Sequence, residues 1–182
     1  MSKLDALMKR GREFLGSEIA VMAGAMSWIS ERNLVSAMSN AGGFGVIACG
    51  AMTPALLDAE IKATQDLTEK PFGVNLITMH PQLPELVDVC QANGVTHVVF
   101  AGGVPPADAI KKAKTFAKVI CFAPAVVLAK RLIKNGADAL VIEGSEAGGH
   151  IGPVSTSVLA QEILPAIRDV PVFVAGGIGR GE

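Results

Sequence analysis

Residues 143–152 place four glycines and a histidine directly after a largely apolar run. The segment reads EGSEAGGHIG. His150 is one of three histidines in the chain, and imidazole is the side chain best suited to act as a general base near neutral pH. Gly148 and Gly149 leave room beside it for a flat ligand to approach the main chain. The pattern predicts a catalytic histidine on a ligand-binding loop, with a structural histidine in a long turn as the alternative.

A second glycine pair, Gly176 and Gly177, follows the apolar residues 172–175. Glycines let backbone N–H groups approach a phosphate, and the N-terminus of a following helix favours negative charge. The segment VFVAGGIGRG has neither the GxGxxG spacing of dinucleotide-binding folds nor the GxxxxGK[ST] spacing of nucleotide hydrolases. A phosphate-binding turn and an ordinary strand-to-helix turn are the two interpretations.

Three other polar residues are candidates for ligand contacts. His80 follows an apolar run in a proline-rich loop and could face the same ligand as His150. His97 begins a strand at the opposite face, where a stabilising role is expected. Asn75 is a carboxamide within the apolar run FGVNLI. A buried carboxamide without partners costs about 1–3 kcal/mol, so we expect Asn75 to hydrogen-bond to a neighbouring strand or to a ligand.

Short runs rich in valine and isoleucine alternate with amphipathic segments along the whole chain. Thr53 before Pro54 is typical of a helix start, and Asn135-Gly136 of a helix end. Strands that alternate with helices predict a parallel sheet. The strand-like runs are residues 19–23, 44–49, 72–77, 96–101, 118–123, 138–143 and 170–175.

Two α/β architectures fit this alternation, an open doubly wound sheet and a (β/α)8 TIM barrel. Glycine-containing segments follow many of the runs, and in a barrel all strand carboxyl ends meet at one face, where active sites lie. We call this the carboxyl-end face. An open sheet would concentrate such loops at its switch point. A barrel needs eight strands and about 250 residues, whereas this chain has 182. We therefore expect a single TIM-barrel domain over residues 1–182, truncated after about the seventh strand and incomplete at its C-terminus.

The composition excludes several classes of partner. The net charge is −1 and only 18% of residues are charged, which gives no basic surface for nucleic acid or for a membrane. No run reaches the roughly 20 apolar residues of a membrane span, and the N-terminus lacks the pattern of a signal peptide. Cys49, Cys90 and Cys121 are isolated, so no metal site is expected. The sequence predicts a cytoplasmic protein with small-molecule partners.

Five segments resemble the FMN-dependent nitronate monooxygenase family, formerly called 2-nitropropane dioxygenases, whose close relatives are the FMN-type enoyl-acyl-carrier-protein reductases. Their motifs occur in the family's order and spacing over essentially the whole chain. The segments are residues 23–30, 41–50, 70–76, 136–152 and 170–181.

This resemblance implies a TIM barrel that binds FMN at the carboxyl-end face. His150 matches the family's catalytic histidine. Gly24, Ala25 and Met26 would pass along the flavin, and Asn75 would hydrogen-bond to it. Gly148 and Gly149 would lie close to the flavin, and Gly176 and Gly177 would bind its phosphate.

The activity implied by the resemblance is oxidation of alkyl nitronates with O2. Reduction of an enoyl thioester with NAD(P)H is the alternative, and a homodimer is compatible with both. Residues 121–127 have no lysine where some nitronate monooxygenases carry one, and here the chain is more similar to the reductases.

Two departures leave further alternatives open. The family's phosphate-binding loop after strand 8 and its C-terminal helical region are not in the sequence. The chain could be a catalytically incompetent fragment, which we would expect to be poorly stable or to associate, or a barrel that binds another phosphorylated ligand without flavin.

Overall fold

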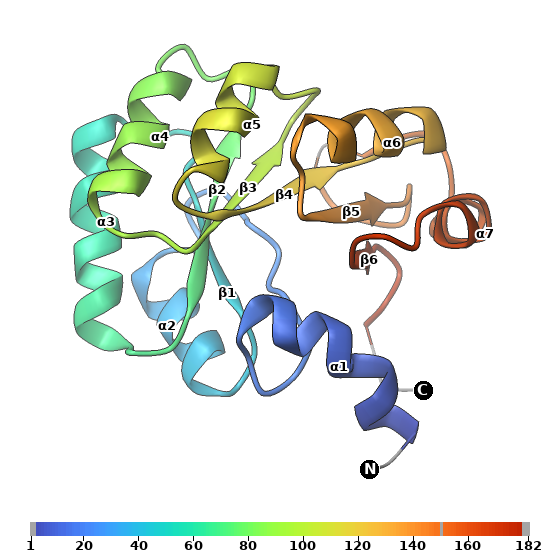
Figure 1. The fold of residues 1–182 in the computed structure, drawn as a ribbon. Helices are drawn as coiled ribbons and strands as arrows, with labels where there is room; N and C mark the ends of the chain where they lie inside the picture. Colours follow the sequence, from blue (N-terminus) through green and yellow to red (C-terminus); the bar gives the residue numbers. More distant parts are fainter. Residues whose placement is uncertain (1–2, 150, 180–182) are drawn as a thin grey trace.

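Six parallel strands form one curved sheet with helices along its outer side (Figure 1). The computed structural model describes residues 3–149 and 151–179. Each strand pairs in parallel with its successor in the chain, so the order is β1-β2-β3-β4-β5-β6. The strands are β1 (Gly45–Ala48), β2 (Phe72–Ile77), β3 (His97–Ala101), β4 (Lys118–Phe122), β5 (Ala139–Glu143) and β6 (Val172–Ala175).

The helices between the strands begin and end largely where the sequence signals lie. Thr53 caps α3 by accepting a hydrogen bond from the Leu56 N–H, and α6 ends at Gly136 with a φ of 117°. The helices are α1 (Lys3–Leu15), α2 (Arg32–Asn40), α3 (Pro54–Leu67), α4 (Leu83–Ala92), α5 (Ala107–Lys114), α6 (Val126–Asn135) and α7 (Thr156–Ala166).

The predicted first strand, residues 19–23, is not a strand in the structure. It makes one parallel bridge, between Met22 and Phe44. The Ala23 N–H donates to the Phe44 carbonyl and the Phe44 N–H donates to the Val21 carbonyl, both at 2.9 Å. Among residues 3–149 and 151–179 this segment pairs on one side only, and the two hydrogen bonds of the bridge do not extend into a strand. The described residues therefore contain six strands of a half-barrel instead of the predicted seven.

The two faces of the sheet are buried against different partners. Alternate strand residues point to opposite faces, so Val98 and Phe100 pack in the cluster beneath the helices while Val99 packs in the cluster on the concave side. The concave cluster also holds Leu15 and Phe44, both fully buried. Burial on both faces accounts for the near-continuous apolar strands.

An open apolar groove separates β6 from the segment before the bridge. It has a volume of about 1000 Å³, and in the described residues β6 pairs with β5 alone. All four residues of β6 are only partly buried. The curvature of the sheet is therefore that of a barrel, but the barrel is not closed along this groove. The groove is lined by residues from α1, residues 20–22, β6 and the end of α7.

Helix α1 packs against the end of the sheet opposite the carboxyl-end face, where His97 is buried. His97 Nε2 donates to the Phe14 carbonyl at 3.0 Å, and Nδ1 lies 2.9 Å from the Thr96 hydroxyl. The Lys118 ammonium donates to the same Phe14 carbonyl. The His97 ring also makes edge contacts with the rings of Phe14 and Phe44. His97 thus lies buried at the face opposite the carboxyl ends, as expected, and its stabilising role stays a prediction.

This environment predicts a pH-dependent stability. Burial lowers the pKa of His97 from 6.5 to about 4, so between these pH values the unfolded chain binds more protons than the folded one. The free energy of unfolding should be highest above pH 6.5 and fall by about 3 kcal/mol as the pH drops to 4. Urea unfolding at several pH values measures this slope. His97→Gln should flatten it, and equal slopes in both proteins would contradict the assignment.

Candidate functional site

The glycine-rich loops after β5 and β6 lie side by side at the carboxyl-end face. Glu143 and Ala175 are register partners in the two strands. Directly beyond them, the Gly144 N–H donates to the Ala175 carbonyl at 3.1 Å. The structure thus brings the loop that leads to His150 next to Gly176. His150 itself lies outside the described residues.

Glu146 and Thr156 connect these two loops to the start of α7. One carboxylate oxygen of Glu146 accepts from the Thr156 N–H at 2.8 Å and lies 3.0 Å from the Thr156 hydroxyl. The same hydroxyl lies 3.3 Å from the Ala175 carbonyl and 3.2 Å from the Gly176 carbonyl. The hydrogen bond from the Thr156 main chain holds the pKa of Glu146 below its ordinary value. Sequence reasoning missed both residues, because neither stands in a motif with catalytic spacing.

Two of the loop glycines are required by close contacts. A Cβ atom at Gly144 would lie 2.0 Å from the Thr156 hydroxyl and 2.2 Å from its nitrogen. Gly176 has a φ of +99°, and a Cβ atom there would lie 2.9 Å from the same hydroxyl. These glycines allow α7 to pack against the ends of β5 and β6.

Gly148 and Gly149 have the opposite surroundings. No described atom lies within 4 Å of a Cβ built at either position. Both residues are exposed. They border open space at the carboxyl-end face and do not pack against another part of the described chain. The close packing of Gly144 and Gly176 accounts for two glycines of this region, while Gly148 and Gly149 are not explained by contacts within the described chain.

Asn75 lies in β2 on the concave face of the sheet. Its register partners are Ala48 and Val99, and Val99 belongs to the concave cluster. Asn75 is 5% exposed, yet its carboxamide makes no hydrogen bond within the described part of the chain; its main-chain carbonyl accepts from the Cys49 N–H. Of the two partners expected for this carboxamide, a neighbouring strand and a ligand, the described strands supply none.

The segment Gly24-Ala25-Met26 follows the Met22 bridge and leaves the sheet at the carboxyl-end face. The buried Ser30 hydroxyl donates to the Gly24 carbonyl at 2.9 Å and accepts from the Met26 N–H at 3.0 Å. The Ser30 carbonyl accepts from the Ala48 N–H, and Ala48 is the register partner of Asn75. The structure therefore brings this segment, through Ser30, to the end of β1 beside the position of Asn75 in β2.

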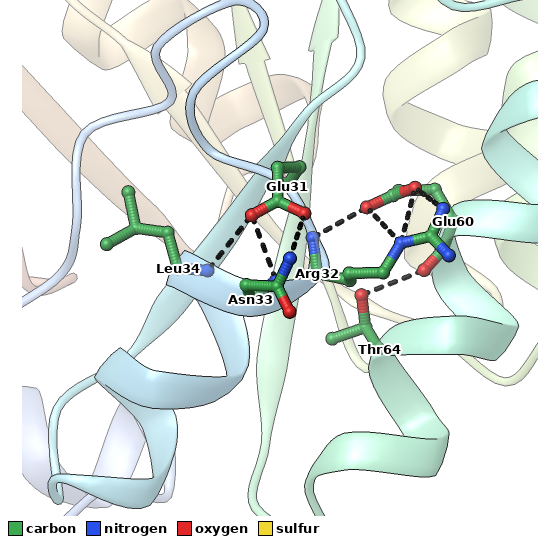
Figure 2. A network of polar contacts seen from close by, with 6 residues as sticks. All are labelled: Glu31, Arg32, Asn33, Leu34, Glu60 and Thr64. Carbon is green, nitrogen blue, oxygen red and sulfur yellow. Dashed lines mark hydrogen bonds and ion pairs between the residues drawn. The ribbon is translucent and has the colours of Figure 1, made fainter.

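A polar network fixes the start of α2 just beyond Ser30 (Figure 2). Glu31 caps the helix, since its carboxylate accepts from the N–H groups of Asn33 and Leu34. Arg32 binds the carboxylate of Glu60 in α3 through its main-chain N–H at 2.6 Å and through its guanidinium. Glu60 is 4% exposed, so this ion pair joins α2 and α3 at a buried carboxylate.

The other candidate residues have structural surroundings. His80 follows β2, as expected, but its Nδ1 accepts a hydrogen bond from the Gln82 N–H at the start of α4. Burial raises the pKa of the Cys49 and Cys121 thiols to about 12, and Cys90 is fully buried too. These thiols are poor nucleophiles for that reason. In the described residues, no three His, Cys, Asp or Glu side chains gather as metal ligands, and no helix is long and apolar enough to cross a bilayer.

Comparison with protein families gives one match that covers almost the whole chain. Residues 9–91 and 83–182 match the family described as nitronate monooxygenase. The chain spans about half the length of the curated relatives it matches, 48% of one and 49% of another.

The individual relatives are named for different enzyme activities. The chain is 37% identical over 172 residues to the (3aS,4S,5R,7aS)-5-hydroxy-7a-methyl-1-oxo-octahydro-1H-indene-4-carboxyl-CoA dehydrogenase of Rhodococcus jostii, covering 93% of this chain and 48% of that one. It is 31% identical over 201 residues to a probable nitronate monooxygenase of Bacillus subtilis, covering 87% and 57%. Among solved structures, FabK from Thermotoga maritima superposes with a TM-score of 0.91 at 39% identity, covering 94% of this chain and 55% of that one.

Proposed function

The chain belongs to the nitronate monooxygenase family, and from this premise we propose that it supplies the catalytic face of an FMN-dependent oxidoreductase. The observation that carries the proposal is the Asn75 carboxamide, which makes no hydrogen bond within the described chain although the residue as a whole is only 5% exposed. A carboxamide can both donate and accept, and it would complement the alternating donors and acceptors of a flavin ring. No fully buried side-chain nitrogen or oxygen in the described chain lacks a partner, so the unbonded carboxamide atoms of Asn75 are accessible to a ligand.

The other proposed FMN-binding residues fit the same group. Gly148 and Gly149 border open space, which suits the approach of a planar ring. Gly176 and Gly177 both have positive φ, and such turns expose N–H groups that can bind a phosphate. The segment Gly24–Met26 would line the ring from the first loop. When bound, FMN supplies electron transfer between the substrate and O2 or NAD(P)H.

For His150 we propose a proton-transfer role. With a neutral nitroalkane its imidazole would remove the proton from the carbon next to the nitro group, which gives the nitronate. With the nitronate itself, which has already lost that proton, the protonated imidazole would stabilise the anion. The substrate in this proposal is an alkyl nitronate and the co-substrate is O2.

An enoyl or other acyl thioester is the second candidate substrate, with NAD(P)H as the electron donor. This second candidate is favoured by sequence identity. The chain is 39% identical to FabK and 37% identical to the carboxyl-CoA dehydrogenase, but 31% identical to the probable nitronate monooxygenase. The lack of a lysine in residues 121–127 supports the same branch.

An absorbance scan between about 350 and 500 nm tests the cofactor directly. We expect the purified complete gene product that carries this sequence to be yellow, and to consume O2 with an alkyl nitronate. Oxidation of NADH that depends on a crotonyl thioester, with little nitronate turnover, would select the second candidate. Failure to bind FMN after FMN is supplied would refute the proposal and leave a different phosphorylated ligand, or an inactive chain, as the explanation.

A further inference from the structure

We propose that Ser30 is a positioning residue, which holds Gly24-Ala25-Met26 in the shape that binds the cofactor. This inference rests on the proposed function for the identity of the ligand. Its structural basis is separate, and it is a set of contacts within the turn formed by residues 24–30.

The Ser30 hydroxyl joins two main-chain groups of the segment. It donates to the Gly24 carbonyl at 2.9 Å and accepts from the Met26 N–H at 3.0 Å. Ser30 is 2% exposed, so water does not compete with these bonds. A hydroxyl has a single donor, and here that donor is committed to Gly24.

Apart from the packing of Ala25 against the concave cluster, the main chain of the segment has little other support. The last hydrogen bond to the sheet is made by the Ala23 N–H. Within the described part of the chain, the remaining hydrogen bonds of Gly24 and Met26 run to the turn itself, because the Met26 carbonyl accepts from the N–H groups of Ile29 and Ser30. Gly24 has no atom within 4 Å of an added Cβ. The positions of Gly24 and Met26 therefore depend on Ser30, whereas Ala25 between them packs against the concave cluster.

The same turn contains a strained residue. Trp28 has a φ of 66° and is the one non-glycine residue with a positive φ in the described ranges. It is 74% exposed, so packing does not hold this conformation. Bulky side chains adopt positive φ only where the surrounding structure imposes it. The bonds from Ser30 close the turn around Trp28 and supply that constraint.

Ser30 can hold the segment because its own position is fixed. Its carbonyl accepts from the Ala48 N–H at 3.0 Å, at the end of β1. The next residues, Glu31 and Arg32, are held by the cap of α2 and by the buried carboxylate of Glu60 (Figure 2). A loop fixed in its binding shape before the ligand arrives loses less entropy on binding.

The test compares Ser30→Ala with Ser36→Ala in the full chain. Ser36 is a buried serine of α2 whose hydroxyl donates to the Asn33 carbonyl, so it is a matched control that does not touch the turn. Binding of FMN is measured by quenching of flavin fluorescence. Trp28 is the single tryptophan, so acrylamide quenching of its emission in the FMN-free protein reports on the turn alone.

We expect Ser30→Ala to weaken FMN binding about tenfold and to increase the quenching of Trp28. Ser36→Ala should change neither. Ser30→Thr keeps the hydroxyl and should restore FMN affinity to within about threefold of the wild type. If Ser30→Ala does not fold, Ser30→Cys replaces it with the same expected result, because a thiol forms weaker hydrogen bonds.

Unchanged FMN affinity and unchanged Trp28 quenching in Ser30→Ala would overturn the inference, as would equal losses in Ser30→Ala and Ser36→Ala. If the wild type binds no FMN while Ser30→Ala still changes the quenching of Trp28, the proposed function fails and the role of Ser30 in shaping the turn stands. The two failures are thus distinguishable.

Discussion

Replacing His150 with alanine is expected to lower turnover about 10²- to 10⁴-fold while FMN stays bound. The reason is that the imidazole is proposed to transfer a proton and not to hold the cofactor. Steady-state rates with an alkyl nitronate and O2, or with NADH and a crotonyl thioester, measure the loss. The pH profile of kcat/KM should lose the limb that reports the catalytic base.

His80→Ala is the matched control for this prediction. His80 also follows a strand at the carboxyl-end face, but its ring accepts a hydrogen bond from the Gln82 N–H just before α4. We expect its turnover to stay within about threefold of the wild type, because loss of this local hydrogen bond mainly lowers stability. Turnover of His150→Ala equal to that of the wild type would remove His150 from the catalytic assignment, whatever the control shows.

Gly144→Ala is expected to lower the free energy of unfolding by about 2–3 kcal/mol. The new Cβ would lie 2.0 Å from the Thr156 hydroxyl, 2.2 Å from its nitrogen and 2.5 Å from the Glu146 carboxylate. Two of these contacts involve atoms fixed by the main chain or by several hydrogen bonds, so α7 has to move away from the end of β5. That movement separates the loops after β5 and β6, and FMN affinity should fall with stability. Urea unfolding followed by circular dichroism measures the first effect.

Gly148→Ala tests cofactor binding on the same loop without the steric clash expected in Gly144→Ala. No described atom lies within 4 Å of a Cβ at this position, so stability should change by no more than about 0.5 kcal/mol. FMN binding should nevertheless weaken, because the methyl group would occupy space that we assign to the cofactor. A large loss of stability in Gly148→Ala, or none in Gly144→Ala, would contradict this division of the glycines.

Local signals were sufficient for most of the fold. Alternation of apolar runs with amphipathic segments predicted the parallel sheet, because strands buried on both faces must be apolar throughout. Thr53 and Gly136 marked helix ends correctly, since capping depends on residues adjacent in the chain. The run at residues 19–23 was predicted wrongly as a strand. Its composition suits a strand, but whether a ladder forms depends on a neighbour, and here a single bridge joins Met22 to Phe44.

The candidate site divides in the same way. Residue order is enough to place glycines after the last two strands, a carboxamide in an apolar strand and a histidine among glycines. Contacts between distant parts of the chain show that Gly144 and Gly176 pack against Thr156, that Gly148 borders open space, and that Ser30 closes the first loop. Propensity, patterning and capping act between near neighbours in the chain, whereas steric clearance and buried hydrogen bonds depend on atoms that come together when the chain folds.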